Sequence, residues 1–140
     1  MSEKLTRREA REYAFGLIYE ADFRPDEDKE SIFDSSADDR EIPDDKYIKE
    51  AYFGVWDNIA DIDAKIAEYS VGWKTERMSR VSHAILRLAV YEMLYRDDIP
   101  SRVTLNEAIE LTKKFDAERA KAFVNGILNS VKNDVGEKNR

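Results

Sequence analysis

One stretch of the chain, residues 79–96 (SRVSHAILRLAVYEMLYR), constrains the fold more than any other. At the 100° per residue of an α-helix, its apolar side chains form one stripe and then continue onto other sides of the helix. A helix that is apolar almost all round has to be surrounded by other helices, because packing on one side would leave half of that surface in water. The sequence therefore predicts a central buried helix over about residues 80–96, with the rest of the chain packed on it.

Apolar residues recur at helical spacing over most of the remaining chain, and alternation typical of strands is scarce. The expected helices, each with approximate bounds, cover residues 6–23, 27–33, 44–70 with a break near Asp61, 79–96, 104–115 and 117–134, with one further turn at 75–78. The helices expected at 6–23 and 104–115 begin with capping boxes, Thr6 with Glu9 and Thr104 with Glu107. At 140 residues the chain has the length of one domain. We expect an all-α single domain of about seven helices over residues 1–140.

The amino-acid composition indicates the cellular compartment and limits the kinds of partner that the protein can have. The chain has no cysteine, which agrees with a reducing compartment, and no apolar run approaches the roughly 18 residues that a membrane helix needs. The net charge is −7, but residues 22–50 hold twelve acids against five bases, so the other 111 residues are neutral overall. We expect a cytoplasmic protein without membrane contact, whose regional acidity is a solvated surface and does not argue against nucleic acid.

A basic band that continues into aromatic side chains runs along one face of the first helix. Its members are Lys4, Arg7, Arg8, Arg11, Phe15 and Tyr19. Arginines near a helix N-terminus oppose the macrodipole, and Arg7 and Arg11 repel each other at i,i+4, so helix stability alone does not explain them. Cations beside rings are typical of surfaces that bind single-stranded nucleic acid. The alternative is structural, with Arg8 in a surface pair with Glu12 and Phe15 in the core.

The sequence offers little for catalysis or metal binding. His83 is the only histidine, and a lone histidine on a helix is more often a packing or surface residue than part of a catalytic triad. The five glycines are scattered singly, so there is no phosphate-binding loop, and no acidic spacing matches a calcium loop. We expect a protein that is not an enzyme and that has no metal or cofactor.

Several segments, taken together in order and spacing, resemble the NusB family of bacterial transcription antitermination factors. They are residues 7–12 (RREARE) and 17–19 (LIY), 84–92 (AILRLAVYE), 98–100 (DIP), 106–111 (NEAIEL), 113–115 (KKF) and 123–128 (FVNGIL). The resemblance implies two small packed helical bundles, an N-terminal one over about 4–70 and a C-terminal one over about 74–134. It also implies a function without catalysis: binding of boxA RNA together with the ribosomal protein NusE, in complexes that keep RNA polymerase elongating, especially on rRNA operons.

The resemblance also suggests which residues make these contacts. With Lys4 from the basic band, the expected RNA-binding residues are Lys4, Arg7, Arg8, Arg11, Tyr19, Phe123 and Asn125. The expected NusE-binding residues are Ser82, Ile85, Asn106 and Glu107. This chain departs from the family pattern at Ser82-His83, where Asp-Arg is common, at Asp116, where glycine is common, and over residues 119–122.

A second function also fits the residues. The chain could be a homodimeric helical protein-interaction module in which the arginine band contacts protein, and dimerisation could also mask an RNA-binding face. Binding of single-stranded RNA separates the two hypotheses.

Overall fold

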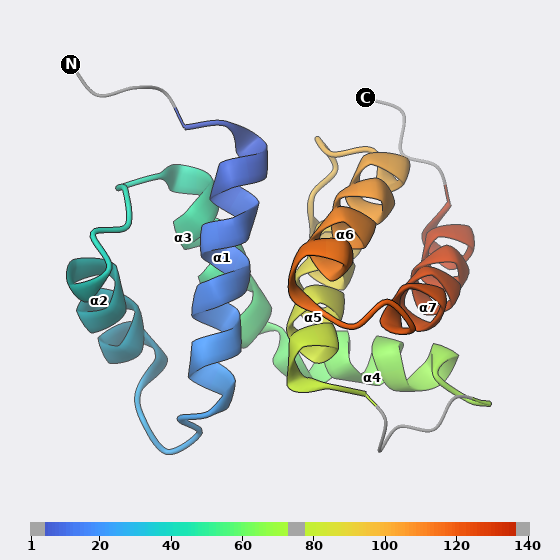
Figure 1. The fold of residues 1–140 in the computed structure, drawn as a ribbon, viewed down its shortest axis with the longest axis horizontal. Helices are drawn as coiled ribbons and strands as arrows, with labels where there is room; N and C mark the ends of the chain where they lie inside the picture. Colours follow the sequence, from blue (N-terminus) through green and yellow to red (C-terminus); the bar gives the residue numbers. More distant parts are fainter. Residues whose placement is uncertain (1–4, 73–77, 137–140) are drawn as a thin grey trace.

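The computed structural model describes residues 5–72 and 78–136, and all regular structure in these residues is α-helical (Figure 1). The helices are α1 (Arg7–Asp22), α2 (Lys29–Asp39), α3 (Lys46–Asp57), α4 (Ile59–Tyr69), α5 (Arg80–Tyr95), α6 (Ser101–Phe115) and α7 (Ala120–Val135). The predicted all-α class with about seven helices is confirmed over this part of the chain. Most of the extra turn expected at 75–78 lies outside the described residues.

The capping box predicted at the start of α1 is present. The Thr6 hydroxyl accepts from the Glu9 backbone N–H at 3.1 Å, and the Thr6 backbone N–H donates to the Glu9 carboxylate at 2.9 Å. Two amides that the helix itself leaves unpaired are thereby satisfied. Because a capping box needs only neighbours in sequence, the sequence predicts it well.

The second predicted capping box is wrong, because α6 begins at Ser101, directly after Pro100, and Thr104 and Glu107 lie inside the helix. The Thr104 hydroxyl donates to the Glu92 carboxylate at 2.6 Å, and Glu107 accepts from Arg8. The two side chains that the sequence assigned to local capping therefore bind partners on other helices.

Other helix ends differ from expectation by a few residues. The Asp28 carboxylate caps the start of helix α2, which runs to Asp39 instead of ending at Phe33 because Ser36, beyond the predicted end, is also buried and donates to Glu20 of α1. The long apolar series breaks at Asn58, before the expected Asp61. The last helix begins at Ala120, three residues later than predicted.

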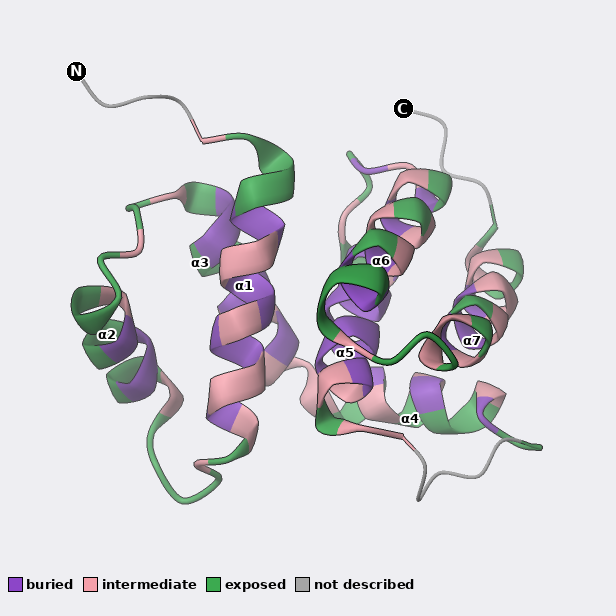
Figure 2. Cartoon of the chain, in the orientation of Figure 1, coloured by how far each residue is buried: buried purple, intermediate pink, exposed green. Residues whose placement is uncertain are grey.

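Helix α5 lies at the centre of the molecule, as its sequence predicts. It packs on α1, α3, α4, α6 and α7, and every residue from 84 to 93 is buried (Figure 2). The buried apolar side chains of all seven helices form one continuous core around it.

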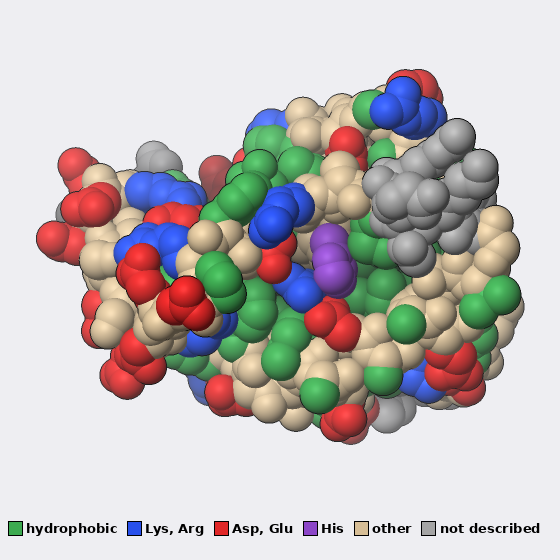
Figure 3. Space-filling model, turned by 90° about the horizontal axis from the view of Figure 1, so that it is seen from below, with side chains coloured by type: hydrophobic (Ala, Val, Ile, Leu, Met, Phe, Trp, Pro, Cys, Tyr) green, Lys and Arg blue, Asp and Glu red, His purple; other side chains and the backbone are tan. Residues whose placement is uncertain are grey.

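The remaining helices lie on two sides of α5 (Figure 1). Helices α2 and α3 pack on α1, whereas α6, α7 and α4 pack on α5 or on one another. Helix α4, which we expected in the N-terminal bundle, packs on α5 and α7, so we place the division between the two groups at Asn58. Acidic side chains gather over the end of the molecule that carries α2 (Figure 3). Within residues 5–72 and 78–136, none of the helices combines the length and apolarity that crossing a bilayer requires.

Candidate nucleic-acid interface

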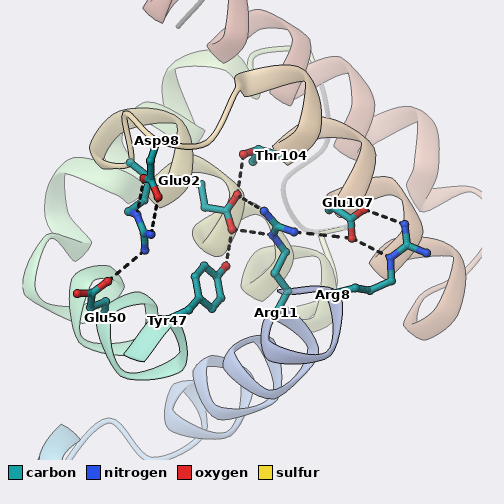
Figure 4. Close-up of polar contacts among 9 residues, drawn as sticks. Arg8, Arg11, Tyr47, Glu50, Glu92, Asp98, Thr104 and Glu107 are labelled. Carbon is teal, nitrogen blue, oxygen red and sulfur yellow. Dashed lines mark hydrogen bonds and ion pairs between the residues drawn. The ribbon is translucent and has the colours of Figure 1, made fainter. Parts of the chain in front are cut away.

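The three arginines at the start of α1 lie in three different environments. Arg11 is buried, with only 5% of its surface exposed. Its guanidinium forms a bidentate ion pair with the Glu92 carboxylate of α5: Nε donates to Oε2 at 2.8 Å and Nη2 donates to Oε1 at 3.1 Å (Figure 4). The interpretation that stability does not explain the arginine band is therefore wrong for Arg11, because this residue neutralises a buried acid.

Glu92 joins four helices through its carboxylate. Besides Arg11 of α1, it accepts hydrogen bonds from the Tyr47 hydroxyl of α3 and the Thr104 hydroxyl of α6 (Figure 4). Burial lowers the pKa of Arg11, but the Glu92 carboxylate outweighs this and the net pKa is raised. Burial, reinforced by the Glu92 charge, raises the pKa of Tyr47. The network holds α1 against α5 and so sets the position of the surface arginines.

Arg8 lies at the surface and is paired with Glu107 of α6. Its side chain is 63% exposed, and its Nε and Nη2 donate to the two carboxylate oxygens at 3.0 and 2.8 Å. Hydrogen bonding to Arg8 lowers the pKa of Glu107, against a smaller opposite effect of burial. Glu107 also lies 3.9 Å from Arg11. An expected partner-binding residue and two expected RNA-binding residues thus form one cluster.

Arg7 is also exposed, and its guanidinium lies over the Tyr47 ring, 4.5 Å from the ring centroid. Stacking uses the face of the guanidinium, whereas its N–H donors lie in the plane where a phosphate can bind. A surface cleft of about 340 Å³ brings Arg7 and Arg8 together with Glu107 and the residues after α5. A second cleft of about 310 Å³ continues past Arg8 to Lys113 and Lys114 of α6. The arginines therefore border a groove between α1 and α6.

Aromatic side chains continue this surface along α1. Tyr19 is half-buried and contacts Phe15 and Phe23, with ring centroids at 6.1 and 5.0 Å. Phe15 is buried, in agreement with the structural alternative for that residue. Tyr19 thus keeps part of its ring open to a base.

The other expected RNA-binding residues lie elsewhere or outside the described chain. Phe123 and Asn125 come from α7, which Figure 1 shows on the other side of α5 and α6 from α1. Asn125 is exposed, and Phe123 is half-buried against the core. Lys4 precedes the described residues.

Of the expected partner-binding residues, Asn106 is exposed and Glu107 half-buried, but Ser82 and Ile85 are 1% and 0% exposed. The Ser82 and Ser79 hydroxyls both donate to the Asp116 carboxylate at the end of α6. Burial raises the pKa of Asp116, but these hydrogen bonds outweigh it and the pKa is lowered. The two departures from the family pattern, at Ser82 and Asp116, are therefore in direct contact.

Sequence reasoning missed Glu92, Tyr47 and Thr104 as residues that position the arginines. The available signal was the acid itself, because a carboxylate inside a helix that is apolar almost all round needs a cationic partner.

His83 lies 3.2 Å from Asp63 and packs beside Arg87. In the described part of the chain, no three His, Cys, Asp or Glu side chains are grouped to hold a metal ion.

Comparisons with known proteins identify the family. The model of the NusB family matches residues 8–133. The transcription antitermination protein NusB of Acetivibrio thermocellus is 44% identical over 131 residues, which cover 89% of this chain and 87% of that protein. The solved T. maritima NusB is 39% identical, with a TM-score of 0.77 and 92% of each chain covered.

A further solved structure contains partners. It holds the antitermination factors NusB and NusE in complex with double-stranded RNA, and its matching chain is 26% identical to this one. The TM-score is 0.77, with 89% of this chain and 94% of that chain covered. The family model and the relatives span nearly the whole described fold, and this chain belongs to the NusB family.

Proposed function

We propose that this protein is a cytoplasmic transcription antitermination factor that binds boxA-type single-stranded RNA together with NusE, in RNA polymerase elongation complexes and especially on rRNA operons. One observation carries the proposal: Arg7 and Arg8 lie exposed at the start of α1, where they line a cleft between α1 and α6, and the half-buried Tyr19 follows on α1. Family membership and the NusB–NusE–RNA complex of a structural neighbour support it.

The RNA contacts divide by chemistry. Arg7 and Arg8 bind phosphates, with Lys4 next to them in sequence, and Tyr19 stacks on a base. Asn125 and Phe123 supply further contacts from α7. Arg11 acts from beneath the surface, because its guanidinium is committed to Glu92.

The NusE contact centres on α6. Asn106 is exposed and Glu107 sits where α6 meets Arg8, so a partner bound there lies beside the RNA-binding arginines. Ser82 and Ile85 of α5 are buried and support α6 in this proposal: Ser82 bonds Asp116 at the end of α6, and Ile85 lines a small pocket together with Glu107. Such adjacency explains physically why RNA and NusE would bind together.

The salt dependence of RNA binding tests the proposal. Two arginine–phosphate contacts predict a slope of about −1.4 for log K against log salt. Replacing both cations, Arg7→Gln with Arg8→Gln, should weaken binding of boxA RNA by the protein–NusE complex and bring the slope toward zero. The matched control, Lys29→Gln with Lys49→Gln, removes two charges from α2 and α3 and should leave the slope unchanged.

An unchanged slope and affinity in the α1 variant would refute these contacts. Indifference of the unsubstituted protein to RNA, combined with a homodimer that covers Arg8 and Tyr19, would favour the protein-interaction module.

A further inference from the structure

Four aromatic rings on α1 and α6 are in unbroken contact, beginning where the arginines end. Phe115, at the end of α6, lies 5.1 Å from Phe15 in centroid distance, Phe15 lies 6.1 Å from Tyr19, and Tyr19 lies 5.0 Å from Phe23. We name these four residues the aromatic strip. Phe15, Tyr19 and Phe23 step by four along α1, and because each such step turns about 40° around the helix, the rings wind gradually away from the side that carries Arg7.

Both ends of the aromatic strip are open to solvent. Among the described residues, four large hydrophobic side chains are exposed: Phe23 at 51%, Val71 at 84%, and Tyr95 and Phe115 at 41% each. Two of the four are the ends of this one strip. Tyr19 is half-buried between them and Phe15 is buried in the core, so the strip exposes ring surface at Phe115, Tyr19 and Phe23.

A cation accompanies each exposed end. The Arg80 guanidinium lies over the Phe23 ring at 4.5 Å, and the Lys114 ammonium lies 5.5 Å from the Phe115 ring centroid. Each is also paired with an acid, Arg80 with Asp22 at 3.1 Å and Lys114 with Glu12 at 2.8 Å. The side chain of Arg80 is 56% exposed. Its planar guanidinium can therefore take a base on its outer side while it rests on Phe23.

The paired charges indicate what binds here. A neutralised surface attracts phosphates weakly, but exposed rings and a guanidinium plane stack with any base, because every base has a π face. A cleft of about 640 Å³ beside Phe15 and Phe115 also takes in Tyr13, Arg40 and Lys114. From Arg7 to Phe23 the helix rises about 24 Å, a length that several nucleotides can span.

We infer that the aromatic strip with Arg80 is a second RNA subsite, which binds bases flanking those held at Arg7 and Arg8 by stacking and without phosphate contacts. The inference rests on the proposed RNA-binding function and extends its site to the far end of α1. The occupant is single-stranded RNA, because the clefts that begin at Arg7 and Arg8 continue past Glu12 and Lys114 to Phe15 and Phe115.

The test is a fluorescence titration of the protein–NusE complex with a boxA RNA of about 12 nucleotides that carries 2-aminopurine at successive flanking positions. Stacking should quench the probe at one or more flanking positions. Phe23→Ser and Phe115→Ser should each abolish that quenching and weaken binding about tenfold, with the salt slope unchanged. Phe23→Trp should keep both signals. Tyr95→Ser, which removes an exposed ring on α5, is the matched control and should change neither.

Thermal unfolding of each variant checks that the exposed substitutions leave the fold intact. Affinity within twofold of the parent, with unchanged quenching, would overturn the inference. Weaker NusE binding with intact RNA binding would also overturn it, since the strip would then be a protein contact. If substitution of Arg7 and Arg8 weakens RNA binding but substitution of the rings does not, only this inference fails. A protein–NusE complex that binds no RNA refutes this inference together with the proposed function.

Discussion

Three arginines at the start of α1 differ in role because their partners differ. Arg7 lies over an aromatic ring, Arg8 forms an exposed pair with Glu107, and Arg11 is buried against Glu92. Removing one partner of a buried pair leaves an uncompensated charge, whereas exposed pairs contribute little to stability. We therefore expect substitutions of Arg7 and Arg8 to change RNA binding, and substitution of Arg11 to lower the stability of the fold.

Glu92→Gln should destabilise the protein by about 3 to 5 kcal/mol, because it leaves the Arg11 charge buried without its counter-ion. Urea unfolding measures the change in free energy of unfolding. Glu68→Gln, which weakens an exposed pair with Lys65, is the control and should cost less than about 1 kcal/mol. Equal losses of unfolding free energy in the two variants would show that the Glu92 network stabilises the fold no more than an exposed ion pair does.

Glu107→Gln should raise the affinity of the isolated protein for RNA. The substitution removes the carboxylate that neutralises Arg8, so the guanidinium is freed for a phosphate and the salt slope becomes steeper. Filter binding without NusE, over a range of salt concentrations, checks both effects. Glu110→Gln removes an acid one turn further along α6 that pairs with Lys113, and it should change RNA affinity less. Weaker binding by Glu107→Gln would contradict the account.

Acid should weaken the fold through Asp63. Burial raises the pKa of this carboxyl, but hydrogen bonds and charge from His83 and Arg87 outweigh it and bring the pKa to about 2, below the ordinary 3.8. The stabilisation is complete above the unfolded-state pKa and is lost as the pH falls toward 2. The stability difference between the parent and Asp63→Asn should therefore shrink between pH 4 and pH 2. A difference independent of pH over that range would contradict this assignment.

At the scale of the helices, close packing of α3 on α5 depends on a glycine. A Cβ at Gly54 would overlap the Tyr91 ring of α5, whereas one at Gly16 of α1 would meet only the flexible end of Arg40, at 3.1 Å. Overpacking of a fixed ring forces side chains or backbone to shift. Gly54 and Gly16 should therefore respond differently to substitution by alanine.

Gly54→Ala should lower the free energy of unfolding by about 1 to 3 kcal/mol, because the clash exceeds the gain in helix propensity. Gly16→Ala should be neutral or stabilising by up to about 1 kcal/mol, since the gain in propensity meets little resistance. Thermal or urea unfolding of both variants compares them directly. A stabilising Gly54→Ala would mean that Tyr91 has room to move.

The helices that the sequence predicts well are those whose signals are local. The apolar pattern over residues 79–96 and the Thr6–Glu9 box need only neighbours in the chain, and both are confirmed. Thr104 carries the same local signal as Thr6, but its hydroxyl bonds Glu92 of another helix, and Pro100 allows α6 to begin earlier. Where a distant partner competes with a local one, sequence spacing gives the wrong helix end.

For the molecule as a whole, the sequence predicts the basic and aromatic face of α1 but not its division into surface and interior. Arg11 is buried because Glu92, 81 positions away, meets it. The aromatic strip depends in the same way on Phe115 meeting Phe15 across two helices. Helical periodicity places residues on a face of their own helix, and only tertiary packing decides which of them reach solvent.

The charge distribution agrees with one RNA-binding face. The excess of acid lies in residues 22–50, from the end of α1 over α2 to the start of α3, while the groove between α1 and α6 is lined, among the described residues, by five cations and four acids. A polyanion is repelled from the acidic surface more strongly than from the nearly balanced groove.

Mapping of amide chemical shifts by NMR, as boxA RNA is added to the protein–NusE complex, is the most direct test of RNA binding along α1. Such binding should perturb α1 from Arg7 to Phe23 and the end of α6, while α2 stays unchanged. Perturbations confined to other helices, with the residues of α1 unaffected, would contradict it.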